Sequence, residues 1–274
     1  MRRKLVIACC LALFVLVGGV LFYAGFASPE PEPLEIPILL YHHILPDEVN
    51  RVYRENPFTV RTEDFEAQMQ YLYDNGFHTL TLSELEAFLH AGRRLPRNSV
   101  MIHFDDGYYS NFVYAYPILQ RFGHRAVVFM ITHMVEDLGD DQPQMDHDSL
   151  TWTAAHSLVG VEDVFELASH THNMHALVPN TGETKLVHAT QEEIVADVRR
   201  SFDFLTNHSA LAYPRGQFND RVIEALQEAG ITMAFTTVEE MVTQDSDPLQ
   251  LGRFKVWRNM TLERFGEIIR GIGI

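Results

Sequence analysis

Residues 99–107 read Ser-Val-Met-Ile-His-Phe-Asp-Asp-Gly, and this stretch decides the fold class. Its first six residues are nearly all apolar or β-branched, which is typical of a parallel strand covered on both faces. Asp105, Asp106 and Gly107 end the run. Asp-Gly pairs are common in turns, but two adjacent carboxylates leaving a buried strand each need a partner or a cation. The stretch therefore predicts a buried strand that delivers two acids to one edge of a sheet.

Similar short runs recur along the chain and alternate with amphipathic helical stretches. The runs are Ile36–Tyr41, Phe77–Leu80, Ala126–Ile131, Val164–Ser169, Ala210–Tyr213 and Ile231–Thr236. Ser83 with Glu86 and Thr190 with Glu193 have the spacing of capping boxes, which predicts two helix starts. Seven strands with intervening helices predict one α/β domain. Because no Gly-x-Gly-x-x-Gly motif follows any run, a closed or nearly closed barrel is favoured over an open doubly wound sheet.

Composition excludes some partners. With 37 acidic and 21 basic side chains the formal charge is −16, and such a surface repels phosphate backbones, so no nucleic acid is expected to bind. The two cysteines, Cys9 and Cys10, lie in the apolar N-terminal run, which leaves the rest of the chain without a disulfide framework or a thiolate metal site. The 14 histidines are the unusual feature.

The N-terminal residues predict a membrane segment. Residues 1–4 form a basic tail, residues 5–27 are apolar and uncharged, and residues 28–35 form a linker of prolines and glutamates. At about 1.5 Å rise per residue, the apolar run is long enough to cross a hydrocarbon core of about 30 Å as one transmembrane helix. The charge pattern places the domain of residues 36–274 outside the cell membrane. A cleaved signal peptide, which would release a secreted protein, is the alternative.

Polar residues follow four of the predicted strands, at the end where barrels of this kind carry their chemistry. They are His42 and His43, Asp105 and Asp106, the segment from His170 to His175, and Pro214-Arg215-Gly216. Since a strand alternates its side chains, only one of the first two histidines can point into the barrel, and His42 is the candidate. Trp152 is either a core aromatic residue or a wall of the substrate cleft.

Three histidines within six positions favour a metal site. Two imidazoles and one carboxylate form a three-ligand set that leaves coordination positions open for water and substrate. His170 and His175 are five residues apart, which does not fit one helix face but suits a loop. His172 is the alternative ligand, and the residues alone do not decide between them.

These residues resemble those of the polysaccharide deacetylases, the carbohydrate esterases that share the NodB homology domain. The likeness includes residues 38–43, Phe104-Asp105-Asp106-Gly107-Tyr108, Ser169-His170-Thr171 and Tyr213-Pro214-Arg215-Gly216. Within that family the chain is most similar to the branch of poly-N-acetylglucosamine deacetylases. The resemblance implies a distorted (β/α)7 barrel that binds one divalent metal ion, with zinc expected and nickel, cobalt or manganese as alternatives.

The resemblance also implies roles for individual residues. Asp106, His170 and His175 would bind the metal, Asp105 would be the general base and His42 the general acid. Tyr213, Pro214, Arg215 and Trp152 would contact the substrate, and the backbone N–H of Arg215 would stabilise an oxyanion. The sequence departs from the family pattern at two places: Ala212 stands where an arginine normally pairs with the base, and His103 replaces a threonine.

The expected reaction is removal of N-acetyl groups from an N-acetylglucosamine-containing polysaccharide of the cell wall or an exported polymer. An esterase acting on O-acetylated polysaccharide would use the same site. A catalytically silent glycan-binding protein is the third interpretation, favoured by the departures at Ala212 and His103.

Overall fold

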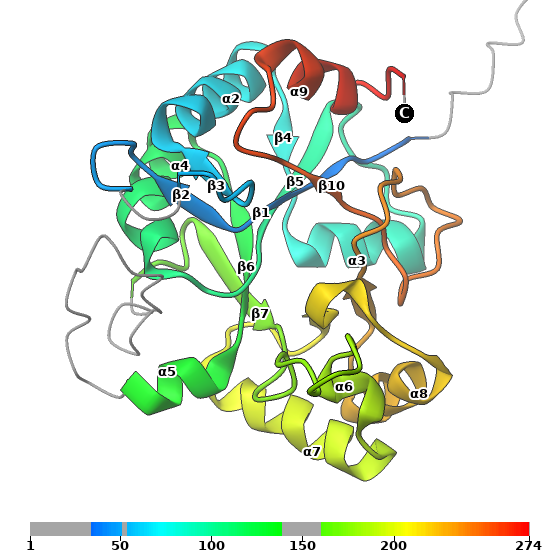
Figure 1. Cartoon of the computed structure of the whole chain (residues 1–274). Coiled ribbons are helices and arrows are strands. Elements are labelled where there is room, and N and C mark those ends of the chain that lie inside the picture. The colour runs from blue at the N-terminus through cyan, green and yellow to red at the C-terminus, as the bar shows by residue number, and fades with distance from the viewer. Residues whose placement is uncertain (1–33, 51–53, 139–159, 274) are drawn as a thin grey trace, which may run out of the picture. The chain divides into compact units, whose positions relative to one another are not determined.

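The computed structural model describes residues 34–50, 54–138 and 160–273 (Figure 1). The predicted anchor at residues 5–27 and Trp152 lie outside this part of the chain. No helix within the described residues has the length and apolar character needed to span a bilayer.

The described domain is built from parallel strands and helices that largely alternate. The strands are β1 (Ile38–Tyr41), β2 (His43–Leu45), β3 (Thr59–Arg61), β4 (His78–Thr79), β5 (Ser99–Phe104), β6 (Ala126–Met130), β7 (Phe165–Ser169), β8 (Ala210–Ala212), β9 (Met233–Phe235) and β10 (Phe254–Lys255). The α-helices are α2 (Thr62–Asp74), α3 (Leu82–Ala91), α4 (Tyr116–Phe122), α5 (Thr132–Leu138), α6 (Lys185–His188), α7 (Gln191–Ser201), α8 (Asp220–Ala229) and α9 (Leu262–Ile268). A π-helix, η1 (Asn111–Ala115), and two 3₁₀ turns, η3 (Phe202–Phe204) and η4 (Pro214–Gly216), complete the set.

The main sheet is a half-barrel of parallel strands, which is consistent with the predicted (β/α)7 barrel. Its strand order is β10-β1-β5-β6-β7-β8-β9, and β4 pairs with β5 off this path. The two ends of the path meet through one segment. Leu251 forms a parallel bridge with Phe235 of β9, and three residues later Phe254 pairs with Leu39 of β1. Residues 251–255 therefore link the two edges of the half-barrel, which is consistent with the nearly closed barrel that the sequence favours.

The predicted strands all occur, and none is more than three residues shorter than predicted. The strands β2, β3 and β10 were not expected. The capping box at Thr190 and Glu193 is confirmed at the start of α7. The one predicted at Ser83 was wrong: α3 begins two residues earlier, because Thr81 accepts from the Glu84 N–H and Glu84 bonds back to the Thr81 N–H. Both pairs have capping spacing, and only the local turn decides between them.

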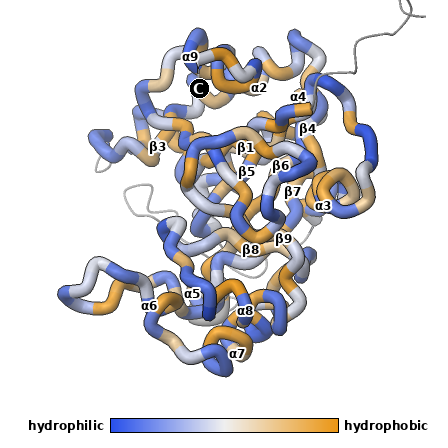
Figure 2. The backbone as a smooth tube through the Cα atoms, turned by 90° about the vertical axis from the view of Figure 1, so that its right-hand side faces the viewer, coloured by the Kyte–Doolittle hydropathy of each residue, from blue (hydrophilic) through white to orange (hydrophobic). Residues whose placement is uncertain are grey.

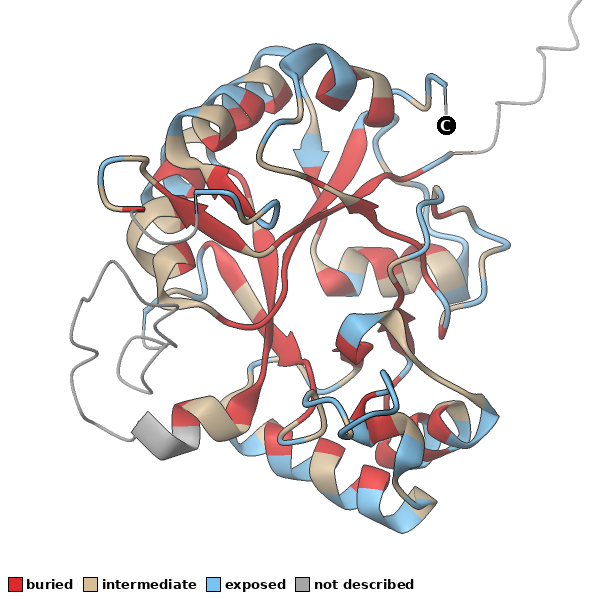
Figure 3. Cartoon of the chain, viewed as in Figure 1, coloured by how far each residue is buried: buried red, intermediate tan, exposed pale blue. Residues whose placement is uncertain are grey.

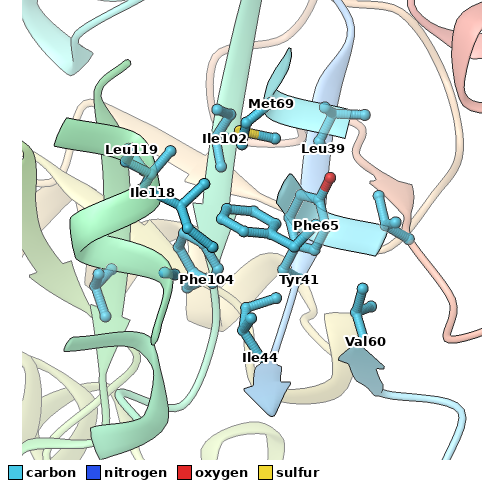
Figure 4. Packing of buried hydrophobic residues seen from close by; sticks show 14 of the residues in the cluster. Leu39, Tyr41, Ile44, Val60, Phe65, Met69, Ile102, Phe104, Ile118 and Leu119 are labelled. Carbon is cyan, nitrogen blue, oxygen red and sulfur yellow. The ribbon is translucent and has the colours of Figure 1, made fainter. Parts of the chain in front are cut away.

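Alternation along the strands separates the barrel interior from the outer layer. Leu39, Tyr41, Ile102 and Phe104 face the helices, where the Phe65 ring of α2 packs edge-on against Tyr41 at a centroid distance of 5.3 Å (Figure 4). Residues of the opposite parity, such as Ile38 and Met101, belong to a second cluster inside the barrel. Most strand residues are buried and hydrophobic, with His78 of β4 as an exposed exception (Figures 2 and 3).

Candidate metal centre and catalytic site

Asp106, His170 and His175 converge at the carboxyl ends of β5 and β7. The Oδ1 atom of Asp106 lies 3.5 Å from His170 Nε2 and 3.4 Å from His175 Nε2. One donor atom from each residue lies within 4.8 Å of the others. For a tetrahedral zinc ion with bonds of about 2.0–2.1 Å, ligand atoms are about 3.4 Å apart. The donor set therefore fits a tetrahedral divalent cation in both chemistry and spacing.

The orientation and protonation state of the two histidines suit metal binding. His170 Nδ1 hydrogen-bonds the carbonyl oxygen of Ala212 at 2.7 Å, which fixes the ring and leaves Nε2 for a ligand. Burial, together with the charge of His170, lowers the pKa of His175 to about 4. A metal-binding imidazole must be unprotonated, and His175 meets this condition at neutral pH.

Both carboxylates reach the site because the backbone turns sharply after β5. Asp106 has a φ of 75°, the left-handed region that non-glycine residues seldom adopt, and Gly107 follows with 77°. A Cβ added to Gly107 would lie 2.7 Å from the sulfur of Met130. A glycine is therefore required after the acids, both for its conformation and for the close approach of β6.

Asp105 is held by an arginine that the sequence did not indicate. Arg253, fully buried between Leu251 and β10, donates from Nη1 to Oδ1 at 2.7 Å and from Nη2 to Oδ2 at 2.8 Å. Its Nε donates to the carbonyl of Thr236. Burial alone would raise the pKa of Asp105, but the charges of Arg253 and His170 outweigh it and hold this pKa well below its usual range.

Arg253 thus supplies the charge that Ala212 lacks, from the segment just before β10. Arg215 does not take that place: it adopts a left-handed φ of 55° in η4, and its charge contributes to the low pKa of His175. Hydrogen bonds from the N–H groups of Gly216 and Gln217 close this turn. The N–H of Arg215 takes no part in them.

The two adjacent histidines have different surroundings. His42 is half-buried and packs against Phe58, and burial lowers its pKa while the charges of Asp106 and Asp105 oppose the shift. His43 is buried, stacks on Tyr108 at 3.6 Å and has Nδ1 2.9 Å from Ser110 Oγ. His42 follows Tyr41, which pairs with Phe104 of β5, so His42 and Asp105 lie at the ends of adjacent strands.

The remaining predicted positions divide between site and core. Pro214 is buried in η4, next to Arg215. The Tyr213 ring lies in the core, where its hydroxyl donates to the carbonyl of Leu249 and its face stacks on Phe218, so its side chain does not reach the candidate site. Trp152 is outside the described residues.

His103 occupies the barrel interior two residues before Asp105. It is fully buried and lies edge-on to Phe129 and Phe235 at centroid distances of 5.0 and 4.7 Å. Neither ring nitrogen has a hydrogen-bond partner among the described residues. Burial and the charge of Arg253 hold its pKa well below the usual value, so His103 fills this position as a neutral aromatic ring.

His172, the alternative ligand, is turned away from the three donors. Its Nδ1 is 3.0 Å from Thr132 Oγ1. The loop that carries it is held by Asp197 of α7, whose two carboxylate oxygens accept the N–H groups of His172 at 2.7 Å and Asn173 at 2.8 Å. One half-buried carboxylate thereby fixes the loop between His170 and His175.

Two histidines and a carboxylate at the strand ends of a barrel, with a second carboxylate alongside, are typical of metal-dependent hydrolases. The family model of the polysaccharide deacetylases matches residues 92–234, and the chain belongs to this enzyme family. The resemblance seen in the sequence motifs is confirmed.

Two relatives and one solved structure illustrate the match. The chain is 28% identical over 243 residues to YxkH of Bacillus subtilis, whose name describes it as a polysaccharide deacetylase. The match covers 88% of this chain and 78% of that protein. The chain is 29% identical over 212 residues to a poly-β-1,6-N-acetyl-D-glucosamine N-deacetylase of Staphylococcus epidermidis, covering 73% and 68%. The Streptococcus pyogenes deacetylase PplD shares the fold, with a TM-score of 0.72 and 24% identity over 86% of this chain and 99% of that one.

Proposed function

We propose that this protein removes N-acetyl groups from an N-acetylglucosamine-containing polysaccharide at a zinc site formed by Asp106, His170 and His175. The observation that carries the proposal is the convergence of these donors beside the arginine-bound Asp105, in a chain of the polysaccharide deacetylase family. A related enzyme that bears the name of a poly-β-1,6-N-acetyl-D-glucosamine N-deacetylase supports this substrate class.

The chain's own groups divide the work of amide hydrolysis. A bound divalent cation would supply Lewis-acid chemistry by acidifying a water and polarising a carbonyl. Asp105, whose Oδ2 lies 3.9 Å from His170 Nε2, removes a proton from the attacking water. His42 donates a proton to the departing amine. The backbone N–H of Arg215 donates to the oxyanion that forms from the acetyl carbonyl.

We further propose that residues 5–27 anchor the protein in the cell membrane with the catalytic domain outside, where it meets cell-wall or exported polymer. The basic residues before this run and the acidic linker after it support that orientation. Mass spectrometry of the membrane-extracted protein tests it: a mature N-terminus at Ser28 would show that the run is cleaved.

Metal removal tests the function. We expect the detergent-extracted full-length protein to contain about one zinc per chain and to release acetate from N-acetylglucosamine oligomers. Dialysis against a chelator should abolish release, and one equivalent of zinc should restore it in the wild type but not in His170→Ala. Acetate from acetylated xylan alone would indicate an O-acetyl esterase. Oligomer binding with neither metal nor acetate release would indicate a glycan-binding protein.

Asp197 offers a second test, which follows from its two hydrogen bonds to the ligand loop. Asp197→Ala should weaken zinc binding by about tenfold, because residues that orient metal ligands have effects of this size. Isothermal titration of the metal-free protein measures it. Asp203→Ala, which removes an exposed partner of Arg200 nearby, is the matched control and should bind zinc as the wild type does. Equal affinity in the Asp197 variant would contradict the prediction.

A further inference from the structure

Two aromatic rings that the proposed chemistry does not use form a pair, and one of them packs against His42. The Phe58 ring is 4.8 Å from the His42 ring and 5.0 Å from the Trp257 ring, measured between centroids. Phe58 is 39% exposed, and Trp257 is half-buried. The aromatic residues of the core, such as Tyr41 and Phe104, are by contrast fully buried. These rings therefore form an open aromatic surface that continues from the candidate site.

The backbone holds this surface rigidly although its two halves are distant in sequence. Phe58 precedes β3 and Trp257 follows β10, and the two segments lie side by side (Figure 1). The N–H of Arg258 donates to the carbonyl of Pro57 at 2.9 Å, and the N–H of His43 donates to the carbonyl of Phe58 at 3.1 Å.

The side chain of Arg258 adds further links. Its Nη1 donates to the carbonyl of Thr59 at 3.2 Å, and its Nη2 pairs with Asp47. Both rings thus stand on fixed backbone before any ligand arrives, which lowers the entropy lost on binding.

We propose that Phe58 and Trp257 form a sugar-binding subsite that stacks on the unit next to the one being deacetylated. A pyranose ring has an apolar C–H face and polar edges. Its C–H face can stack on an exposed aromatic ring and leave water, while its polar edges stay hydrated. An amine freed by earlier turnover would add a cation–π attraction. The proposal rests on the proposed function, because it places a polysaccharide at this site.

The position of His42 identifies which sugar unit the surface binds. His42 contacts Phe58, and it follows Tyr41 of β1, which pairs with Phe104 of β5, so His42 links the aromatic surface to the strand end that carries Asp105. A sugar on Phe58 and Trp257 is then one ring removed from the reacting acetyl group. The subsite consequently favours oligomers over the single sugar.

Chain-length dependence of the reaction tests the subsite. We expect the wild-type kcat/KM for acetate release to rise from one to five N-acetylglucosamine units. Trp257→Ala and Phe58→Leu should each lower it by about tenfold on the longer oligomers, mainly through KM, and flatten the length dependence. Tyr73→Leu is the matched control: this ring is 59% exposed and packs on Phe122 in another part of the domain, and its loss should change nothing.

A binding measurement separates this inference from the proposed function. The tryptophan emission of the otherwise unchanged protein reports the binding. The emission should change saturably with a glucosamine pentamer, with about tenfold weaker affinity in Phe58→Leu. If the wild type releases no acetate but this titration saturates, the proposed function fails and the subsite stands. An unchanged emission would overturn the subsite. So would variants whose kcat/KM for acetate release falls by the same factor at every oligomer length.

Discussion

Replacing Asp105 with asparagine should lower kcat for acetate release by about 10²- to 10⁴-fold while zinc remains bound. Asparagine keeps the shape of the side chain but cannot accept the proton of the attacking water at neutral pH. The three proposed metal donors are untouched, because Asp105 lies beside them and is bound to Arg253 instead. Acetate release and zinc content of the same purified sample measure the two effects.

The neighbouring residue supplies the contrast. Asp106→Asn, one position further, removes a charged donor from the set and should lose zinc together with activity. A fully active Asp105→Asn variant would exclude Asp105 as the base. Equal zinc loss in both variants would show that the two carboxylates do not have separate roles.

The second large effect is expected for stability. Arg253→Met should lower the free energy of unfolding by about 3–5 kcal/mol, because it leaves the buried carboxylate of Asp105 without its partner. Urea denaturation of the metal-free protein measures this. Arg121→Met is the matched control, since Arg121 pairs with Glu66 at the surface and exposed pairs contribute about 0–1 kcal/mol. Wild-type stability of Arg253→Met would contradict the prediction.

The loss of unfolding free energy in Arg253→Met should depend on pH in a defined direction. The pKa of Asp105 is lowered in the folded protein, so the stabilisation is fully present above its unfolded pKa of about 3.9 and is lost as the pH falls toward the folded value. Without Arg253, burial raises the pKa of Asp105 in the folded variant, so the difference between wild type and Arg253→Met should begin to shrink above about pH 4 and continue to shrink on further acidification. In the double variant with Asp105→Asn, the cost should be smaller at pH 7, because no unpaired charge remains.

Much of the fold was predictable because buried parallel strands require nearly continuous apolar runs. The run that ends at Asp105 and Asp106 also located the candidate site, since its carboxylates had to face a partner. The spacing of His170 and His175 excluded a helix but left the choice of ligand to the family resemblance. The structure places those two rings together and turns His172 toward Thr132.

The same kind of pattern could not indicate Arg253. Arg253 directly precedes β10, which has only two residues, and Arg253 and Lys255 interrupt any apolar run that would have predicted a strand there. Its partner lies 148 positions earlier, so no local pattern connects them. The only signal was an arginine between the apolar residues Leu251 and Phe254. Its role becomes clear only from the sheet order, which brings it into contact with Asp105. For Tyr213 the motif predicted a substrate contact, but a motif position does not show which way a ring points, and this ring lies in the core.

The segment that joins both edges of the sheet also carries the arginine that binds Asp105, the proposed base. During synthesis, Asp105 leaves the ribosome long before residues 251–255 do. Asp105 therefore gains its two hydrogen bonds to Arg253 only when this late segment docks. Phe254 and Phe265, which follow Arg253, complete the main core, so the last step of folding also orients the proposed base.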